Sequence, residues 1–237
     1  MRDTNSIFKE LAGKVPVKHV SERWLQSFYL NQQNLYAKHI KRILDNVLSL
    51  LILFAASPIM LITVVAIKLD GDGPVLYRQR RVGKEGKEFE LIKFRSMIKD
   101  AEKETGPVWA DEKDRRVTSV GRILRPLGID ELPQLLNVIK GEMSLVGPRP
   151  ERPEFVADFI GQSQKKDSII PFYKKRLFVK PGVTGWAQVM YPYASSYEQT
   201  LEKVGYDFYY IKNMSLHLDL WILLKTIKVM IFGRSPR

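Results

Sequence analysis

Cysteine is absent from the 237-residue chain, and histidine occurs only three times. Without cysteine the chain has neither disulfides nor thiolate metal ligands. His19, His39 and His217 are too far apart in sequence to form ligand pairs, so a zinc site is not expected. We also find no Walker loop, no GxGxxG fingerprint and no Ser/His/Asp arrangement. The common nucleotide-binding loops and hydrolase triads are therefore excluded as sources of chemistry.

Positive charge exceeds negative charge. The chain has 38 Lys and Arg against 26 Asp and Glu, which gives a net charge of +12. Such a surplus implies an anionic partner, and nucleic acid, anionic lipid headgroups and phosphorylated small molecules all qualify. The length allows one substantial core, and composition alone does not choose among these partners.

The longest apolar run covers 46–67, which is 22 residues without a charge. As a helix it would extend about 33 Å, the thickness of a bilayer's hydrocarbon core, so we predict that it enters a membrane. Basic residues flank both ends of the run, whereas the positive-inside rule places them on the cytoplasmic side. Because Ser57-Pro58 lies near the middle, we favour a re-entrant helix that breaks there over a kinked spanning helix.

The order of segments predicts three parts: an N-terminal extension (1–37), a re-entrant membrane helix (38–70) and a catalytic domain (71–237). The extension has an amphipathic pattern around Trp24 to Leu30. Its role cannot be read from the sequence.

Within the last part, the runs 75–82 and 89–94 on either side of a glycine-containing turn predict two strands. Apolar periodicity predicts a helix over 130–140. A further apolar helix over 216–232 suits a membrane surface, with Lys225 and Lys228 toward lipid phosphates, or else packs on the core. We therefore expect a mixed, helix-rich α/β fold.

Asp130 and Glu131 are the acidic pair on which we expect catalysis to depend. A local interpretation makes Asp130 a helix N-cap and Glu131 a favourable first-turn acid. A functional interpretation uses the same geometry: a carboxylate at a helix N-terminus keeps a low pKa and points outward. It would then act as a nucleophile or bind Mg2+ through oxygen. Neighbouring helical residues point about 100° apart, so the two acids would have different roles.

Several cations surround this pair in the sequence, and guanidinium groups suit phosphate oxygens. Arg149 lies between Pro148 and Pro150, which stiffens its loop and lowers the cost of ordering it. For Arg122 a solvated surface position is an equal alternative. The candidates for substrate binding are Lys93, Arg95, Arg125 and Arg149.

Five blocks of the sequence occur together in a recognisable order. They are the basic-flanked apolar segment with Ser57-Pro58, LIKFRSM (91–97), GRILRPLGIDELPQLLNVIKGEMSLVGPRPE (121–151), KPGVTGWAQV (180–189) and DFYYIKNMSLHLDL (207–220). From about Lys38 to the C-terminus the chain closely resembles the monotopic phosphoglycosyl transferases, also called bacterial sugar transferases or polyprenyl-phosphate hexose-1-phosphate transferases.

The resemblance implies a fold and a location. These are a re-entrant membrane helix-break-helix followed by an α/β catalytic domain with interfacial helices. The expected site is the bacterial inner membrane, in contact with its lipid and with the catalytic domain on the cytoplasmic face. Nucleic acid is then not a partner, and formation of a homodimer stays open.

The resemblance also implies a Mg2+-dependent reaction in two steps. The aspartate matching Asp130 attacks the β-phosphate of a UDP-sugar, releases UMP and keeps a covalent sugar phosphate. Undecaprenyl phosphate then accepts that group, which is the first membrane step of a surface polysaccharide or glycoconjugate. Glu131 matches the second acid, and Arg125 and Arg149 match cations near the phosphates. Arg95 stands where some members have lysine.

Two alternatives stay open. A membrane-tethered basic protein that binds nucleic acid or anionic lipid would show salt-sensitive binding that does not depend on Asp130. An ordinary glycosyltransferase would release UDP. The identity of the sugar and the pathway cannot be read from these residues.

Overall fold

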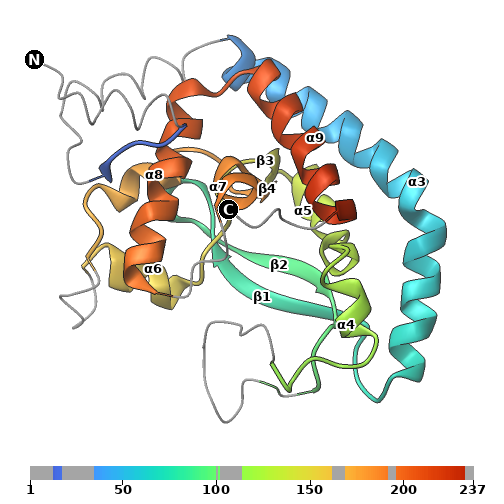
Figure 1. Ribbon diagram of the computed structural model, residues 1–237. Helices are drawn as coiled ribbons and strands as arrows, with labels where there is room; N and C mark the ends of the chain where they lie inside the picture. Colours follow the sequence, from blue (N-terminus) through green and yellow to red (C-terminus); the bar gives the residue numbers. More distant parts are fainter. Residues whose placement is uncertain are drawn as a thin grey trace, which may run out of the picture.

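The computed structural model describes residues 13–17, 35–99, 101, 114–161, 169–191 and 196–232. The amphipathic pattern near Trp24 to Leu30 lies outside the described residues. Helix α3 (Lys41–Leu69) forms one edge of the molecule, and the strands cross the middle of the molecule (Figure 1). Helices α6 (Pro153–Phe159) and α8 (Tyr197–Asn213) lie on the opposite side.

Two small sheets form the centre. Strands β1 (Leu76–Val82) and β2 (Glu88–Phe94) pair antiparallel around a turn that contains η3 (Lys84–Gly86), which confirms the predicted strands. Strands β3 (Ser144–Val146) and β4 (Gly182–Thr184) pair parallel.

The remaining helices lie before, between and after these strands. In chain order they are η2 (Tyr36–Ile40), α4 (Gly121–Leu124), η4 (Ile129–Glu131), α5 (Gln134–Lys140), η6 (Tyr173–Phe178), α7 (Trp186–Met190) and α9 (Leu216–Phe232). Val138, Met143, Phe208, Ile211 and Ile222 are fully buried in the main core. The fold is therefore mixed α/β and rich in helix, as expected.

Helix α9 has two different faces. Asp219 and Ile222 are buried, whereas Leu220 and Leu224 are exposed. Lys225 lies over the Trp221 ring, with its Nζ 4.3 Å from the ring centroid, so this lysine is directed at the protein and not outward. One face of α9 thus packs on the core while the other is free for an apolar environment.

Helix α3 continues through Ser57-Pro58, so the predicted break is wrong. Pro58 has no backbone N–H for the carbonyl of Phe54, four residues earlier. The Ser57 hydroxyl donates to that same carbonyl at 2.8 Å, which satisfies the acceptor that Pro58 leaves without a donor. The helix bends instead of ending (Figure 1). Its 29 residues extend about 43 Å.

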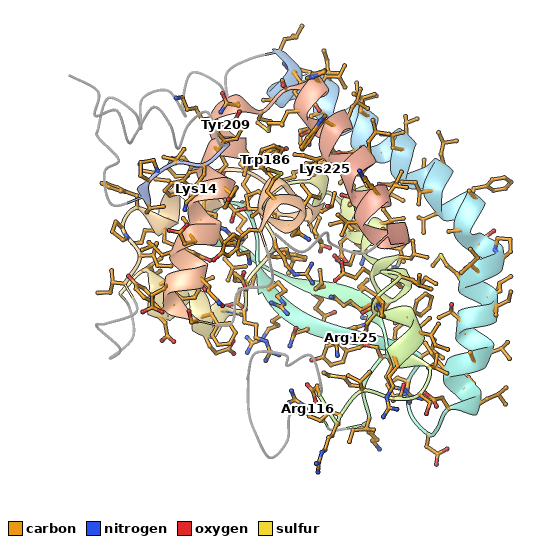
Figure 2. All side chains as sticks on the ribbon, viewed as in Figure 1. Lys14, Arg116, Arg125, Trp186, Tyr209 and Lys225 are labelled. Atoms are coloured by element: carbon orange, nitrogen blue, oxygen red, sulfur yellow. The ribbon has the colours of Figure 1, made fainter. Side chains whose placement is uncertain are left out.

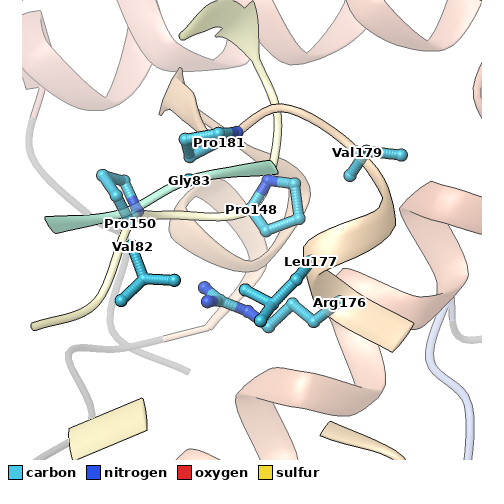
Figure 3. A pocket seen from close by; sticks show the side chains of 8 residues that line it. All are labelled: Val82, Gly83, Pro148, Pro150, Arg176, Leu177, Val179 and Pro181. Atoms are coloured by element: carbon cyan, nitrogen blue, oxygen red, sulfur yellow. The ribbon is translucent and has the colours of Figure 1, made fainter. Parts of the chain in front are cut away.

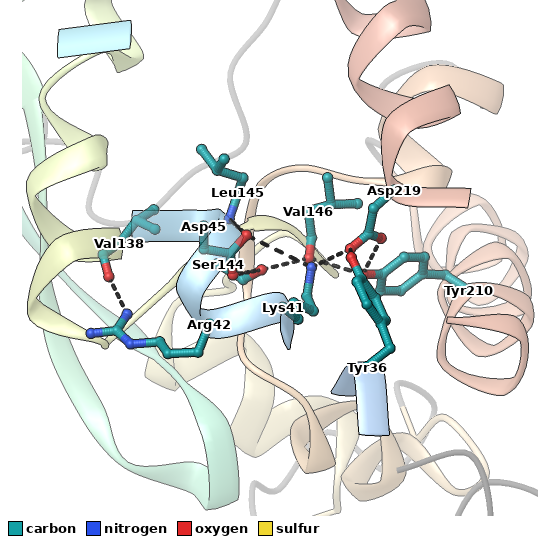
Figure 4. A network of polar contacts seen from close by, with 10 residues as sticks. All are labelled: Tyr36, Lys41, Arg42, Asp45, Val138, Ser144, Leu145, Val146, Tyr210 and Asp219. Carbon is teal, nitrogen blue, oxygen red and sulfur yellow. Dashed lines mark hydrogen bonds and ion pairs between the residues drawn. The ribbon is translucent and has the colours of Figure 1, made fainter. Parts of the chain in front are cut away.

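The N-terminal end of α3 is bound to the rest of the protein by a buried polar network (Figure 4). Lys41 and Tyr36 both donate to Asp219 of α9. Asp45 accepts from the Ser144 hydroxyl at 2.7 Å and the Leu145 amide at 3.3 Å, both on β3. Buried charges are stable only when paired in this way, so the network fixes the start of α3 to α9 and β3.

The C-terminal end of α3 is also attached. Asp70 accepts a hydrogen bond from the Val120 amide at 3.0 Å, just before α4, and Ile67 packs with Phe94 and Leu124. Between the two attached ends the apolar middle is exposed, and Phe54 keeps 83% of its surface. Among the described residues, α3 is the one helix long and apolar enough to cross a membrane.

Part of the N-terminal extension belongs to the core. Val15 and Val17 are buried, and the Val15 amide donates to Gly205 O of α8 at 3.0 Å. Gly13 O accepts from the Trp186 indole N–H at 2.6 Å. Trp186 in turn stacks on Tyr209, with ring centroids 5.5 Å apart (Figure 2). Residues 13–17 therefore form a strap across α7 and α8.

The strap can be tested at Gly205. In an ordinary helix interior, Gly→Ala stabilises by about 0.5–1 kcal/mol. At Gly205 a Cβ would collide with Val15 O, so we expect Gly205→Ala to lower the unfolding temperature and to speed cleavage by trypsin at Lys14. In a chain that lacks residues 1–17 the same substitution should be stabilising. A stabilised full-length Gly205→Ala would contradict the strap.

Candidate active site

Asp130 and Glu131 lie in η4, a single turn between α4 and α5. Gly128, before the turn, has φ +63°, a left-handed conformation that glycine adopts without strain. A Cβ at Gly128 would also lie 3.1 Å from Met230 Cε of α9. The acidic pair thus lies next to the end of α9. Helix α5 begins only at Gln134, so the interpretation of Asp130 as a helix N-cap is wrong.

Glu131 is held between two cations. Its Oε1 accepts from Lys93 Nζ of β2 at 2.7 Å and from Arg149 Nη2 at 2.6 Å. Burial raises the pKa of the Glu131 carboxyl, but the charges and hydrogen bonds of Arg149 and Lys93 outweigh it and hold that pKa well below its usual range. Glu131 is therefore a permanent anion that brings Lys93 and Arg149 together.

Asp130 has a different environment. It is 7% exposed, and burial raises the pKa of its carboxyl above the usual value, although Lys93, Arg125 and Arg149 act in the opposite direction. The expectation of an outward-pointing carboxylate with a low pKa is wrong, because the turn places Asp130 inside the site. In the described part of the chain its carboxylate accepts no hydrogen bond from another side chain. The two acids thus differ, as predicted: Glu131 is clamped and Asp130 is available.

Lys93 is positioned by a residue that sequence reasoning missed. Asn137, fully buried on α5, accepts from the Ile92 amide at 3.1 Å and donates to Glu90 O at 2.7 Å. These bonds join α5 to β2 and hold Lys93 beside the η4 turn. Burial lowers the pKa of the Lys93 ammonium, and Glu131 opposes that shift. The only signal in the sequence was a polar residue inside an apolar helix.

Arg95 does not face the acidic pair. Its Nη1 donates to Asp72 O at 2.7 Å, and its Nη2 donates to Ile67 O at 2.9 Å and Gly71 O at 2.6 Å. The guanidinium is buried and satisfies carbonyls at the end of α3. This corrects the expectation that Arg95 binds substrate: Lys93 lies within β2 and reaches Glu131, whereas Arg95 lies just beyond the strand's end and binds carbonyls at the C-terminal end of α3.

Arg125 ends α4 and is half-buried, close enough to Asp130 for its charge to lower that carboxyl's pKa (Figure 2). Within the described residues its side chain has no hydrogen bond or ion pair. Arg122 is exposed, which agrees with the alternative that it occupies a solvated surface position. The structure therefore gathers Asp130, Glu131, Lys93, Arg125 and Arg149, and excludes Arg95.

The role of Arg95 is open to a direct test. Arg95→Met removes the donor for three carbonyls, so we expect a loss of about 2–4 kcal/mol in the free energy of unfolding. Affinity for UDP, measured by calorimetry, should stay within about twofold. Exposed Arg122→Met is the stability control. Weak UDP binding by a fully stable Arg95→Met variant would restore Arg95 as a phosphate ligand.

Comparison with known proteins identifies the family of the chain. Residues 36–233 match the model of the bacterial sugar transferase family. The chain is 46% identical over 231 residues to the UDP-N-acetylgalactosamine-undecaprenyl-phosphate N-acetylgalactosaminephosphotransferase of Aeromonas hydrophila, covering 98% of this chain and 52% of that protein. It is 39% identical over 190 residues to the UDP-glucose:undecaprenyl-phosphate glucose-1-phosphate transferase of Escherichia coli, covering 79% of this chain and 39% of that protein.

A shorter relative matches along most of its length. The putative undecaprenyl-phosphate N-acetylgalactosaminyl 1-phosphate transferase of Bacillus subtilis is 44% identical over 160 residues, which is 68% of this chain and 85% of that protein. The chain thus spans about half or less of the two longer relatives and most of the shorter one. On the match over residues 36–233, the chain belongs to the bacterial sugar transferase family.

Proposed function

We propose that this protein transfers a sugar 1-phosphate from a UDP-sugar to undecaprenyl phosphate and releases UMP. The observation that carries the proposal is the contrast within one turn: Asp130 is buried and available, while Glu131 next to it is clamped by Lys93 and Arg149. The relatives' names share the undecaprenyl phosphate acceptor, although their sugars differ.

The reaction would proceed by two displacements at one phosphorus atom. A carboxylate oxygen of Asp130 attacks the β-phosphorus of the UDP-sugar, and the bond to the bridging oxygen breaks, so UMP leaves with the bonding electrons. A phosphate oxygen of undecaprenyl phosphate then attacks the same phosphorus and releases the Asp130 carboxylate. The product is undecaprenyl diphosphate sugar.

The charges around Asp130 suit this chemistry. Burial raises the carboxyl's pKa, which makes the ionised form a stronger nucleophile, while Lys93, Arg125 and Arg149 favour that ionised form. The same cations offset the charge that builds on the phosphoryl oxygens during transfer. Glu131 already neutralises part of the charge of Lys93 and Arg149, which leaves Arg125 as the cation of this group without an ion pair among the described residues.

The donor set also fits Mg2+. Carboxylate oxygens are its preferred protein ligands, and it usually takes one or two of them together with substrate phosphates. Asp130 is the candidate ligand, since Glu131 Oε1 is occupied by two cations. When bound, the ion would neutralise diphosphate charge and orient the leaving UMP.

We further propose that α3 is re-entrant and that the catalytic domain lies on the cytoplasmic face of the inner membrane. Both ends of α3 are attached to one domain, through Lys41 and Asp45 at its start and Asp70 at its end. A helix that crossed the bilayer would put one of these ends on the far side, away from its partners. The bend at Pro58 lets the exposed apolar middle enter the membrane and return.

The chemistry is tested by nucleotide release from UDP-N-acetylgalactosamine, UDP-glucose and other UDP-sugars, with Mg2+ and undecaprenyl phosphate. We expect UMP from the wild type and at least about 10³-fold slower release from Asp130→Asn, which lacks the nucleophile. Exposed Asp72→Asn is the matched control. Release of UDP would indicate simple glycosyl transfer. Equal activity of Asp130→Asn would contradict the assignment of the nucleophile.

Topology is tested by cysteine labelling, because the natural chain has no cysteine to interfere. We expect His39→Cys, exposed in η2 just before α3, and Lys68→Cys, exposed in the last turn of α3, to react in inside-out vesicles and to resist impermeant maleimide in intact cells. Phe54→Cys at the apolar middle should react from neither side. Labelling of one end from the periplasm would show that α3 spans the membrane.

A further inference from the structure

The loop that carries Arg149 is fixed at each of its carbonyl groups. Pro148 and Pro150 have no N–H to donate, so at these two positions the backbone can be held only through its carbonyl groups. Four consecutive carbonyls each accept a hydrogen bond from a different group. The pairs are Pro148 O with Gly182 N, Arg149 O with Arg176 Nη2, Pro150 O with Arg81 Nη1 and Glu151 O with Val82 N.

Arg176 is the unusual donor among these four. It lies in η6 and is 4% exposed, and a charge so deeply buried needs compensation. Its Nε donates to Asp207 Oδ2 of α8 at 2.6 Å, and its Nη1 donates to the Tyr173 hydroxyl at 3.2 Å. One guanidinium thus spans from the loop to α8, with Asp207 fixing its orientation.

Apolar side chains line a pocket next to this guanidinium. Figure 3 shows Arg176 beside Leu177 in this pocket, which Val82, Pro148 and Pro150 also line. Proline and aliphatic walls keep water from competing for the hydrogen bond to Arg149 O, which makes that bond stronger than an exposed one. Glu151 is paired with Lys203 at 2.7 Å, and the same Oε1 lies 4.0 Å from Arg176 Nη2, so Glu151 adds a second, longer ion pair that keeps Arg176 at the loop.

The Arg149 peptide therefore has a charged group on each side. Its carbonyl is held by Arg176, and its side chain reaches Glu131 beside the nucleophile. The short proline-flanked backbone leaves little freedom between these two contacts. A shift of the carbonyl would move the guanidinium relative to the phosphorus that Asp130 attacks.

We propose that Arg176 is a positioning residue for this reaction, which sets the place of Arg149 through its backbone carbonyl and itself touches no substrate. The inference rests on the proposed function. Asp207 and Tyr173 belong to the same device, because they fix the Arg176 guanidinium. Misplacing a group that stabilises the transition state by about 1 Å can reduce the rate about 10²-fold, so a remote residue can have a large effect.

The test is a double-mutant cycle on kcat/KM for UMP release, with Arg176→Lys and Arg149→Lys alone and combined. Arg176→Lys keeps the charge next to Asp207 but loses the second arm that reaches Arg149 O. We expect Arg176→Lys alone to reduce kcat/KM by about 10–100-fold, and to cause less than about threefold further loss in the Arg149→Lys background. Exposed Arg80→Lys on β1 is the matched control and should be neutral in both backgrounds.

A purely structural role makes a different prediction. Losses from Arg176→Lys and Arg149→Lys would then multiply, and they would follow the fall in unfolding temperature measured for each variant. That result overturns the inference. If Arg176→Lys does not fold, Tyr173→Phe, which removes only the hydroxyl partner of Arg176, replaces it in the same cycle with the same criterion. A wild type that releases no UMP overturns the proposed function as well, whereas multiplying losses in an active enzyme overturn the inference alone.

Discussion

The hydrogen bonds of Glu131 to Lys93 and Arg149 are the interaction on which the site depends. They join three separate pieces of chain, β2, the η4 turn and the loop after β3, at a single carboxylate oxygen. The two part-buried cations would repel each other without this anion, and the anion would lose much of its solvation without gaining partners if they were absent. Because the three charged groups stabilise one another only when they are in contact, these contacts fix the positions of the three pieces of chain relative to one another. Asp130 then receives its position next to two cations without having to pair with either.

The attachment of α3 extends the same logic to the membrane. Lys41 and Asp219 make a buried pair between α3 and α9, and Asp45 binds the start of β3, which continues directly into the loop of Arg149. At the other end Arg95 closes the helix carbonyls and continues from the strand that carries Lys93. The start of α3 therefore contacts the strand that leads to Arg149, and the end of α3 contacts a residue that follows the strand of Lys93. Helix α3 and the acidic pair are therefore connected through the same two strands.

Local patterns in the sequence predicted much of this arrangement. The apolar run, the β1–β2 strands and the cluster of Asp130, Glu131 and Arg149 follow from hydrophobicity, alternation and charge, which act over short stretches of chain. The direction of Arg95 could not be predicted, because guanidinium groups that bind phosphate and those that bind carbonyls look alike in sequence. In the continuous α3 the Ser57 hydroxyl donates to Phe54 O, and the sequence does not tell which rotamer Ser57 adopts. The burial of Asp130, and the roles of Asn137, Arg176 and Asp219, arise from contacts between residues far apart in the chain.

The bond between Ser57 and Phe54 has a mechanical consequence. A helix whose hydrogen bonding is restored at the proline bends as one body, without a loose joint between two rods. Both ends of this single body are attached to the rest of the protein, so its apolar middle cannot move freely relative to the acidic pair. The distance from its apolar apex to Glu131 is then a constant of the fold, at about 1.5 Å per residue of limb. In the re-entrant arrangement proposed above, the depth of this apex below the acidic pair would be set by the length of the two halves of α3 and not by the thickness of the bilayer.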